Sequence, residues 1–209
     1  MAPRVHNTLS YSVAALTLLA VCPWNKPAAL YVALLWAFHF TRRSLESLFV
    51  HRYSGRAVPP GDFLVEYVYY WGFAAWIGWS MRSAAWSLPA LPSVLGGTAI
   101  FLLGEAGNSW AHQKLRHLRQ TSGQTKRAVP RGGLFTWVSC PHYLFEITSW
   151  CGFLLVSQLL GAAVFLGLGA IIVTSYALSR HRAYHKEFDG HAGRESYPSE
   201  RKAILPYVL

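Results

Sequence analysis

The fold is decided by residues 144–179, LFEITSWCGFLLVSQLLGAAVFLGLGAIIVTSYALS, in which Glu146 is the one charged side chain. A membrane-spanning helix needs about 20 apolar residues to cross a hydrocarbon core of ~30 Å. The run is too long for one such helix, so we expect it to divide near Gly161 into two spans, 144–159 and 161–179. This stretch therefore predicts an all-α, multi-pass integral membrane protein.

Apolar composition extends this prediction to the rest of the chain. Of the 209 residues, 53% are hydrophobic and 13% charged, about half the ~25% charged share of a soluble domain. These values argue against a disordered chain, a fibrous protein or a typical soluble enzyme, and the length suits a single domain over 1–209. No signal-peptide cleavage pattern precedes the first apolar run, so we expect a retained helix there. The remaining runs bring the expected spans to six, at roughly 88–107, 63–80, 28–40 and 8–22.

The basic residues are distributed unevenly between the two sides of these spans. A formal net charge of +10 would suggest nucleic acid in a soluble protein, but here the basic residues lie between long apolar runs. With six spans, 17 of the 19 Lys and Arg residues fall on the side of both termini and of loops 41–62 and 108–143. Lys26 and Arg82 remain on the other side. The positive-inside rule then predicts cytosolic termini.

The cysteine spacing and the absence of familiar catalytic motifs limit the kinds of site that the sequence predicts. Cys22, Cys140 and Cys151 have neither disulfide nor zinc spacing and lie in apolar surroundings, so we interpret them as reduced packing residues. The sequence has no HExxH motif or carboxylate dyad. We therefore expect no metal site.

The first polar cluster is HFTRRSLESLFVHRYS, from His39 to Ser54. Glu46 follows Arg42 by four residues, so the two side chains can pair across one helical turn. The plainer interpretation is the snorkelling basic end of a span.

The second polar cluster is GNSWAHQKLRHLR, residues 107–119. Four of its side chains fall within about 80° of one another on a helix and form one cationic stripe: Asn108, His112, Arg116 and Arg119. The stripe could clamp a polyanion such as a nucleotide cofactor, or it could face anionic lipid head groups. The residues alone leave both readings open.

The third polar cluster runs from Arg131 to Phe153. Its glycine pair at 132–133 offers a flexible turn, a weak signal because no GxGxxG or Walker pattern follows. Tyr143 and Glu146 share a helix face, and a carboxylate within an apolar run is costly unless it is paired or functional. A structural ion pair is the alternative. Later in the chain, a second shared face contains His181, Tyr184 and His185.

Taken in order, these clusters resemble one family. HF-x-x-R-x-x-ES-x-FVHRYS, YYWGFAAW (69–76) and N-x-x-x-H-x-x-LR-x-LR are similar to the very-long-chain trans-2-enoyl-CoA reductases of the steroid 5α-reductase superfamily. GGLF-x-x-VSCP-x-Y-x-x-E-x-x-SW and the closing RKAILP are shared more widely in the superfamily. The resemblance covers about residues 38–209.

The resemblance implies a multi-span reductase of the endoplasmic reticulum membrane that uses NADPH. Glu46 and Tyr143 match the acid and the tyrosine regarded as catalytic, with Tyr143 as proton donor. The cofactor-binding residues expected from the resemblance and from the clusters are Asn108, His112, Arg116, Arg119, Arg131, His142, Glu146, His181 and Tyr184.

The expected reaction is reduction of a trans-2-enoyl-CoA during fatty-acid elongation. The expected partners are long-chain enoyl-CoA, the lipid bilayer and other elongation enzymes, without nucleic acid. Three alternatives remain: a reductase of a steroid or polyprenoid double bond, a non-catalytic membrane scaffold and, more remotely, a lipid methyltransferase.

The sequence also departs from the family pattern. The ubiquitin-like domain with which the enoyl-CoA reductases usually begin is absent from it. His142 stands where most members have Asn, and Ala128 replaces a Tyr of the steroid reductases. Residues 189–196 look inserted. The first two departures bear on the substrate, and the others bear on how the cofactor is held.

Overall fold

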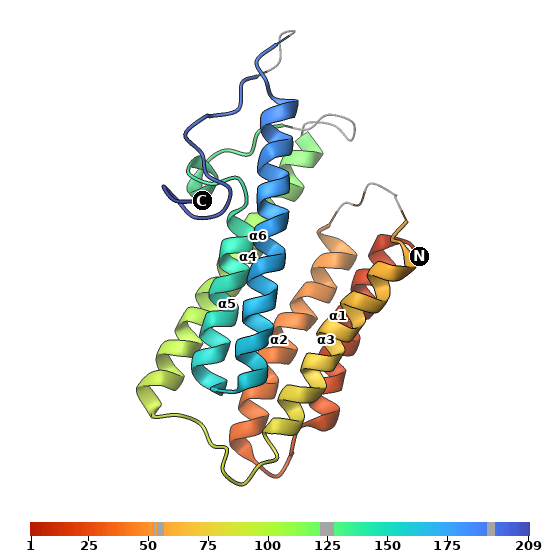
Figure 1. The fold of residues 1–209 in the computed structure, drawn as a ribbon, viewed down its shortest axis with the longest axis vertical. Helices are drawn as coiled ribbons and strands as arrows, with labels where there is room; N and C mark the ends of the chain where they lie inside the picture. The colour runs from red at the N-terminus through yellow and green to blue at the C-terminus, as the bar shows by residue number, and fades with distance from the viewer. Residues whose placement is uncertain (52, 54–56, 122–127, 192–194) are drawn as a thin grey trace. The chain divides into compact units, whose positions relative to one another are not determined.

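The computed structural model describes residues 1–51, 53, 57–121, 128–191 and 195–209. Over these residues the chain is all-α, with one short 3₁₀ helix and two isolated β-bridges in place of any strand. The expected all-α fold is therefore confirmed. In chain order (Figure 1) the elements are α1 (Pro3–Val21), α2 (Pro27–Phe49), α3 (Pro60–Ser80), α4 (Leu91–Thr121), η1 (Gly133–Thr136), α5 (Pro141–Ser157) and α6 (Leu160–Glu187).

Proline marks where several of these helices begin. α1, α2 and α3 each have Pro in their first turn, and α5 begins at Pro141. A proline at the first helical position is favourable because its missing N–H would have no intrahelical partner there.

The predicted apolar runs and the helices agree in number and order but differ at their ends. Residues 88–90 precede α4, since Pro92 fits the first turn of a helix but not its interior. The last two helices separate before Leu160 rather than at Gly161, at a residue (Gln158) with a φ of 49°. α2 and α4 continue well beyond their apolar runs, so the first two polar clusters lie largely on helical extensions of those runs.

Membrane-crossing character is concentrated in one element. Among the helices described, α6 alone is both long and apolar enough to cross a bilayer.

The chain forms two compact units. Unit 1 comprises Met1–Phe101 and Trp150–Leu166, and unit 2 comprises Leu102–Ser149 and Gly167–Leu209. In unit 1, α1 lies against α2 and α3 (Figure 1). The centre of this unit is Trp36, which is fully buried and donates a hydrogen bond from Nε1 to the Ala14 carbonyl, 3.0 Å away. Further aromatic rings surround it at centroid distances of 4.8–5.7 Å, namely those of Phe40, Trp150, Phe153 and Phe165.

Unit 2 is held together by small cores and by the end of the chain. Residues 137–140 pair with 202–203 through three backbone hydrogen bonds of 2.8–3.0 Å, including Ser139 N–H to Lys202 O. α4 and α5 approach very closely at Gly104, where a Cβ atom would lie 2.4 Å from the Ser149 nitrogen. Only glycine fits there, and the contact fixes the next turn of α4 against the start of α5.

Candidate functional site

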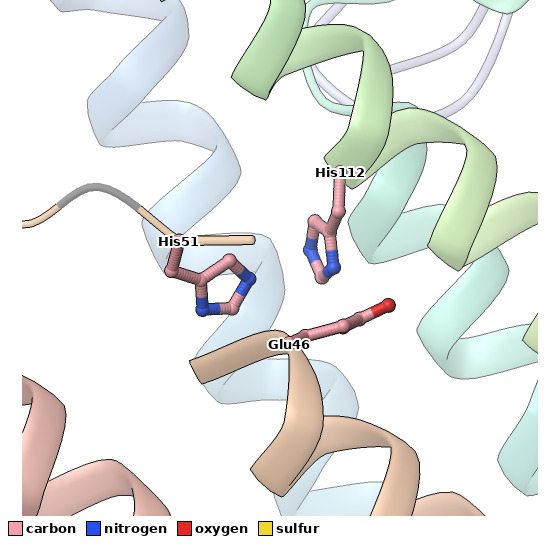
Figure 2. Close-up of side chains that lie close together, drawn as sticks. All are labelled: Glu46, His51 and His112. Carbon is pink, nitrogen blue, oxygen red and sulfur yellow. The ribbon is translucent and has the colours of Figure 1, made fainter. Parts of the chain in front are cut away.

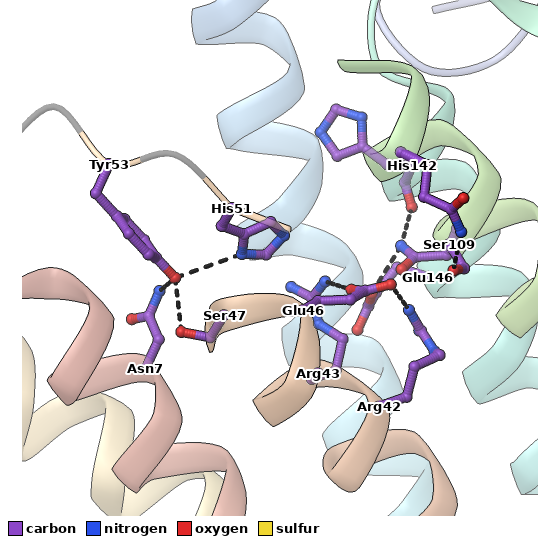
Figure 3. A network of polar contacts seen from close by, with 12 residues as sticks. Asn7, Arg42, Arg43, Glu46, Ser47, His51, Tyr53, Ser109, His142 and Glu146 are labelled. Atoms are coloured by element: carbon purple, nitrogen blue, oxygen red, sulfur yellow. Dashed lines mark hydrogen bonds and ion pairs between the residues drawn. The ribbon is translucent and has the colours of Figure 1, made fainter. Parts of the chain in front are cut away.

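The acid of the first cluster lies on α2 in unit 1. Glu46 is 4% exposed, and its two carboxylate oxygens accept hydrogen bonds from Arg42, at 2.5 Å, and Arg43, at 2.9 Å (Figure 3). The expected Arg42–Glu46 pair is confirmed, and the Arg43 contact adds to it. A buried carboxylate needs such partners because an uncompensated charge is costly away from water. Its position on α2, with His51 just beyond the end of that helix, can be followed in Figure 2.

A hydroxyl network lies beside this acid in unit 1. The Tyr53 hydroxyl is 2.8 Å from Ser47 Oγ, accepts from Asn7 Nδ2 at 3.0 Å, and lies 3.4 Å from His51 Nδ1 (Figure 3). These contacts join α1, α2 and the segment after α2. Two residues of the first motif, Arg52 and Ser54, lie outside the described residues.

Unit 1 contains a second buried polar group that sequence reasoning missed. His6 is 1% exposed, and its ring nitrogens contact Glu66 Oε2 at 2.8 Å and the Tyr67 hydroxyl at 3.2 Å. The sequence does contain a signal for this buried group, because Glu66 is an acid within an apolar run, as Glu146 is. Its partner was not visible, because His6 lies about 60 residues earlier in the sequence.

The central feature of unit 2 is an amide that bridges α4 and α5. Asn108 is 1% exposed, and its Nδ2 donates to the His142 carbonyl at 2.8 Å and to Glu146 Oε2 at 3.0 Å. His142 and Glu146 are labelled in Figure 3. The Asn108 Oδ1 atom is buried and has no hydrogen-bond partner in the described part of the chain. A buried acceptor without a donor is costly, which makes this atom a candidate contact for a ligand N–H or O–H.

Ring contacts connect the group of Asn108, His142 and Glu146 to His112 and Tyr143. His112, on α4 (Figure 2), has its ring centroid 5.5 Å from that of His142, which lies 4.2 Å from the Tyr143 ring. A pocket of about 360 Å³ is lined by Tyr143 of α5 and by Tyr176, Ser179 and Arg180 of α6. Ser179 and Arg180 follow Tyr176 by three and four residues, so the three side chains lie on one face of α6.

The cationic stripe lies on the last turns of α4 in unit 2. Arg116 is half-buried and Arg119 is exposed. Arg131, after the loop, forms an ion pair with Glu195 and keeps 64% of its side chain exposed. Two arginines of the stripe therefore lie on α4. Arg131 instead contacts Glu195, in the segment 189–196 that is predicted to be an insertion.

The glycine pair forms a turn whose backbone requires glycine. Gly132 has a φ of 81° and Gly133 a φ of 57°, values that residues with a Cβ rarely adopt. A Cβ at Gly133 would also lie 2.7 Å from the Trp110 ring. The expected turn is therefore present at this glycine pair, and it packs on Trp110 of α4.

The chain end completes the polar side of unit 2. Ser139 Oγ lies 2.6 Å from His181 Nδ1 and 2.8 Å from the Tyr197 hydroxyl. The Tyr184 and Tyr197 rings stack with an interplanar angle of 3°. Tyr197 belongs to this group although sequence reasoning assigned it no role, since only the fold brings residues 139, 181 and 197 together.

Burial sets the protonation state of three groups here, all outside the expected spans. It raises the pKa of the Cys140 thiol to about 12 and, despite the nearby Arg119, that of Tyr184 to about 12. It lowers the pKa of His181, as do the neighbouring charges of His185 and Lys202. At neutral pH these groups are therefore neutral.

All of the predicted site residues except Glu46 lie in unit 2. Asn108, His142 and Glu146 are in direct contact, and His112 and Tyr143 continue that group through ring contacts. His181 belongs to the hydrogen-bonded group around Ser139.

The sequence of the chain matches one known family. The chain belongs to the family described as 3-oxo-5-alpha-steroid 4-dehydrogenase, whose sequence profile matches residues 89–209.

Individual relatives support the resemblance to the enoyl-CoA reductases. The chain is similar to the very-long-chain enoyl-CoA reductase of Dictyostelium discoideum, with 36% identity over 88% of this chain and 60% of the relative. It is similar to the human trans-2,3-enoyl-CoA reductase-like protein, with 30% identity over 82% of this chain and 47% of the relative. Bovine 3-oxo-5-alpha-steroid 4-dehydrogenase 1 is 30% identical over 84% of the chain and 66% of the relative. The chain thus spans about 60% of the length of the Dictyostelium relative, and the predicted resemblance is confirmed.

Proposed function

We propose that this chain catalyses NADPH-dependent reduction of the 2,3 double bond of trans-2-enoyl-CoA in fatty-acid elongation. The observation that carries the proposal is the 36% identity to a very-long-chain enoyl-CoA reductase over 88% of the chain. Long-chain enoyl-CoA is then the substrate, and other elongation enzymes are the expected neighbours.

The residues of unit 2 suit a dinucleotide. Asn108 has a buried amide oxygen that, among the residues described, has no partner and could accept from a cofactor N–H or O–H. The arginines of α4 suit phosphates. Neutral His181 and Tyr184 can add hydrogen bonds without opposing charge. The residues proposed to hold NADPH are Asn108, His112, Arg116, Arg119, Arg131, His142, Glu146, His181 and Tyr184.

The protein's own residues would then supply the proton chemistry. When bound, NADPH provides the hydride that the β carbon of the enoyl thioester accepts. Negative charge builds on the thioester oxygen as an enolate, and the α carbon must receive a proton. Tyr143 is the proposed donor, because its ring packs on His142 beside the amide group and its side chain lines a pocket. Glu46 is the proposed second catalytic residue, with Arg42 and Arg43 fixing the orientation of its carboxylate.

The membrane arrangement is part of the proposal. We place six spans in the endoplasmic reticulum membrane, with both termini and loop 108–143 cytosolic, because 17 of the 19 basic residues then share one side. Protease protection in sealed microsomes would test this arrangement. A protected C-terminus would contradict it.

The decisive experiment compares acceptors. Purified protein with NADPH should convert a long-chain trans-2-enoyl-CoA to the saturated acyl-CoA, detected by mass spectrometry together with NADPH oxidation. The same preparation should be tested with a 3-oxo-Δ4-steroid, a polyprenal and no acceptor. Failure to bind NADPH would favour the scaffold alternative.

A steroid reductase is the second candidate. The family description over residues 89–209 and the similarity to the bovine steroid enzyme favour it. Faster turnover of the steroid than of enoyl-CoA would establish it in place of the first proposal.

A further inference from the structure

The pocket beside Tyr143 contains a cation, Arg180, that has no part in the cofactor binding or proton transfer proposed above. Arg180 lines this pocket with Tyr143, Tyr176 and Ser179, and its guanidinium is close enough to the Tyr143 hydroxyl for a side-chain hydrogen bond. The pocket therefore combines one guanidinium with three hydroxyl groups.

The direction of the Arg180–Tyr143 bond follows from the chemistry of the two groups. A guanidinium has five N–H donors and no acceptor, so the phenol oxygen of Tyr143 must accept. The hydroxyl proton of Tyr143 is then not used in this bond.

In the described part of the chain, the other ionisable groups that influence Arg180 carry no negative charge. Cys140 and Tyr184 are close enough to influence it, but burial raises the pKa of each to about 12, so both are neutral at physiological pH. His142 contacts the Tyr143 ring, with the two ring centroids 4.2 Å apart. The positive charge of Arg180 thus acts mainly on the phenol that it contacts.

We propose that Arg180 is the positioning residue for Tyr143, and that their shared pocket receives the thioester of the enoyl-CoA. This inference rests on the proposed function. After hydride addition to the β carbon, the enolate's α carbon takes the Tyr143 proton, the thioester carbonyl re-forms, and Tyr143 is left as a phenolate. Arg180 stabilises that phenolate until solvent returns a proton.

A double-mutant cycle tests the pair. Arg180→Met should lower kcat by about 10–100-fold, the loss expected for a charge-assisted hydrogen bond, and should change the KM for NADPH by less than about twofold. Arg180→Lys should recover most of the rate because it keeps the charge. In a Tyr143→Phe background, Arg180→Met should have no further effect. The matched control is Arg182→Met, since Arg182 is an exposed arginine two residues along α6 that does not line the pocket.

A second readout needs no activity. With 3-fluorotyrosine at position 143, the ¹⁹F titration of the phenol should move by about one pH unit or more to higher pH in Arg180→Met. An unchanged titration, or a parent-like kcat in Arg180→Met, would overturn the inference. If the titration moves but the parent protein reduces no enoyl-CoA, the Arg180–Tyr143 pair stands and the proposed substrate falls.

Discussion

The two units stabilise their key carboxylates in different ways. Glu46 in unit 1 is neutralised by arginines three and four residues earlier on its own helix. Glu146 in unit 2 accepts from Asn108, an amide 38 residues earlier on another helix. The first arrangement is local and compensates charge with charge. The second depends on the close packing of α4 and α5 and leaves one amide oxygen without a hydrogen-bond partner among the described residues.

This difference predicts different consequences of mutation in the two units. Removing the partners of an acid that is compensated within its own helix should lower the stability of unit 1, in addition to any loss of the catalytic role proposed for Glu46. A cluster assembled across segments, with an unused acceptor and an adjacent pocket, should affect mainly binding and turnover. Substitutions in each unit can test this difference.

Replacing Tyr143 should have the largest effect. Tyr143→Phe keeps the ring but deletes the hydroxyl, so turnover of enoyl-CoA should fall by about 10²–10⁴-fold, as expected when a general acid is lost. NADPH affinity and thermal stability should remain close to those of the parent. Tyr207→Phe is the control, because Tyr207 is 76% exposed near the chain end. If the Tyr143 variant turns over at nearly the parent rate, this residue is only a helix anchor.

Removing both arginine partners of Glu46 should have the next largest effect. Arg42→Met with Arg43→Met leaves a buried carboxylate uncompensated and should lower the free energy of unfolding by about 3–5 kcal/mol. Glu46→Gln should cost less, since the two arginines can extend toward water. Thermal or denaturant unfolding in detergent measures both. Equal losses would show that the charge on Glu46 is not what the arginines stabilise.

The contrast between the units also explains what the sequence could reveal. The Arg42–Glu46 pair and the shared face of Tyr143 and Glu146 follow from helical spacing, which is a local rule. The six helices follow from the apolar runs. In each case the relevant residues lie within a few turns of one another.

Long-range contacts could not be predicted in this way. Asn108 was expected to contact a cofactor, but its bonds to residues 142 and 146 require the close approach of α4 and α5. The His6–Glu66 contact and the docking of Tyr197 on Ser139 likewise join residues about 60 positions apart. No local periodicity encodes such pairs. The sequence therefore predicted which residues are polar in apolar surroundings, but not which partners satisfy them.

Gly133→Ala should produce a smaller but measurable loss. The substitution forces a Cβ into a left-handed backbone and against Trp110, so the free energy of unfolding should fall by about 1–3 kcal/mol. Gly72→Ala in α3 is the matched control, because nothing lies within 4 Å of its Cβ position. That change should be neutral or should stabilise by up to about 1 kcal/mol. If the two variants are equally stable, the turn is looser than its geometry indicates.

Arg119→Ala should weaken cofactor binding about tenfold, which corresponds to the loss of one phosphate contact. The effect should appear in the KM for NADPH, with little change in the KM for enoyl-CoA. The parent should prefer NADPH to NADH because the extra phosphate rewards a surplus of arginine. Arg82→Ala, in unit 1, should leave the cofactor KM unchanged. Equal use of both cofactors by the parent would contradict the assignment.

The smallest effect is expected at Cys140, where the native protein should show almost no thiol labelling. Burial raises the pKa of this thiol to about 12, so at pH 8 only about 10⁻⁴ of it is the reactive thiolate. A variant with Cys22→Ala and Cys151→Ala should therefore react with maleimide at a rate limited by opening of the segment over residues 137–140.

That segment is held by Lys202, whose N–H donates to the Trp137 carbonyl at 3.0 Å. Lys202→Pro removes this donor and should accelerate labelling of Cys140, whereas Lys202→Ala keeps the backbone bond and should not. Rapid labelling of the unaltered segment would mean that the chain end does not cover Cys140 in the native state. A mobile chain end could not hold Tyr197 against His181. The group around Ser139 would then not be preformed, and its assignment to the cofactor site would fall.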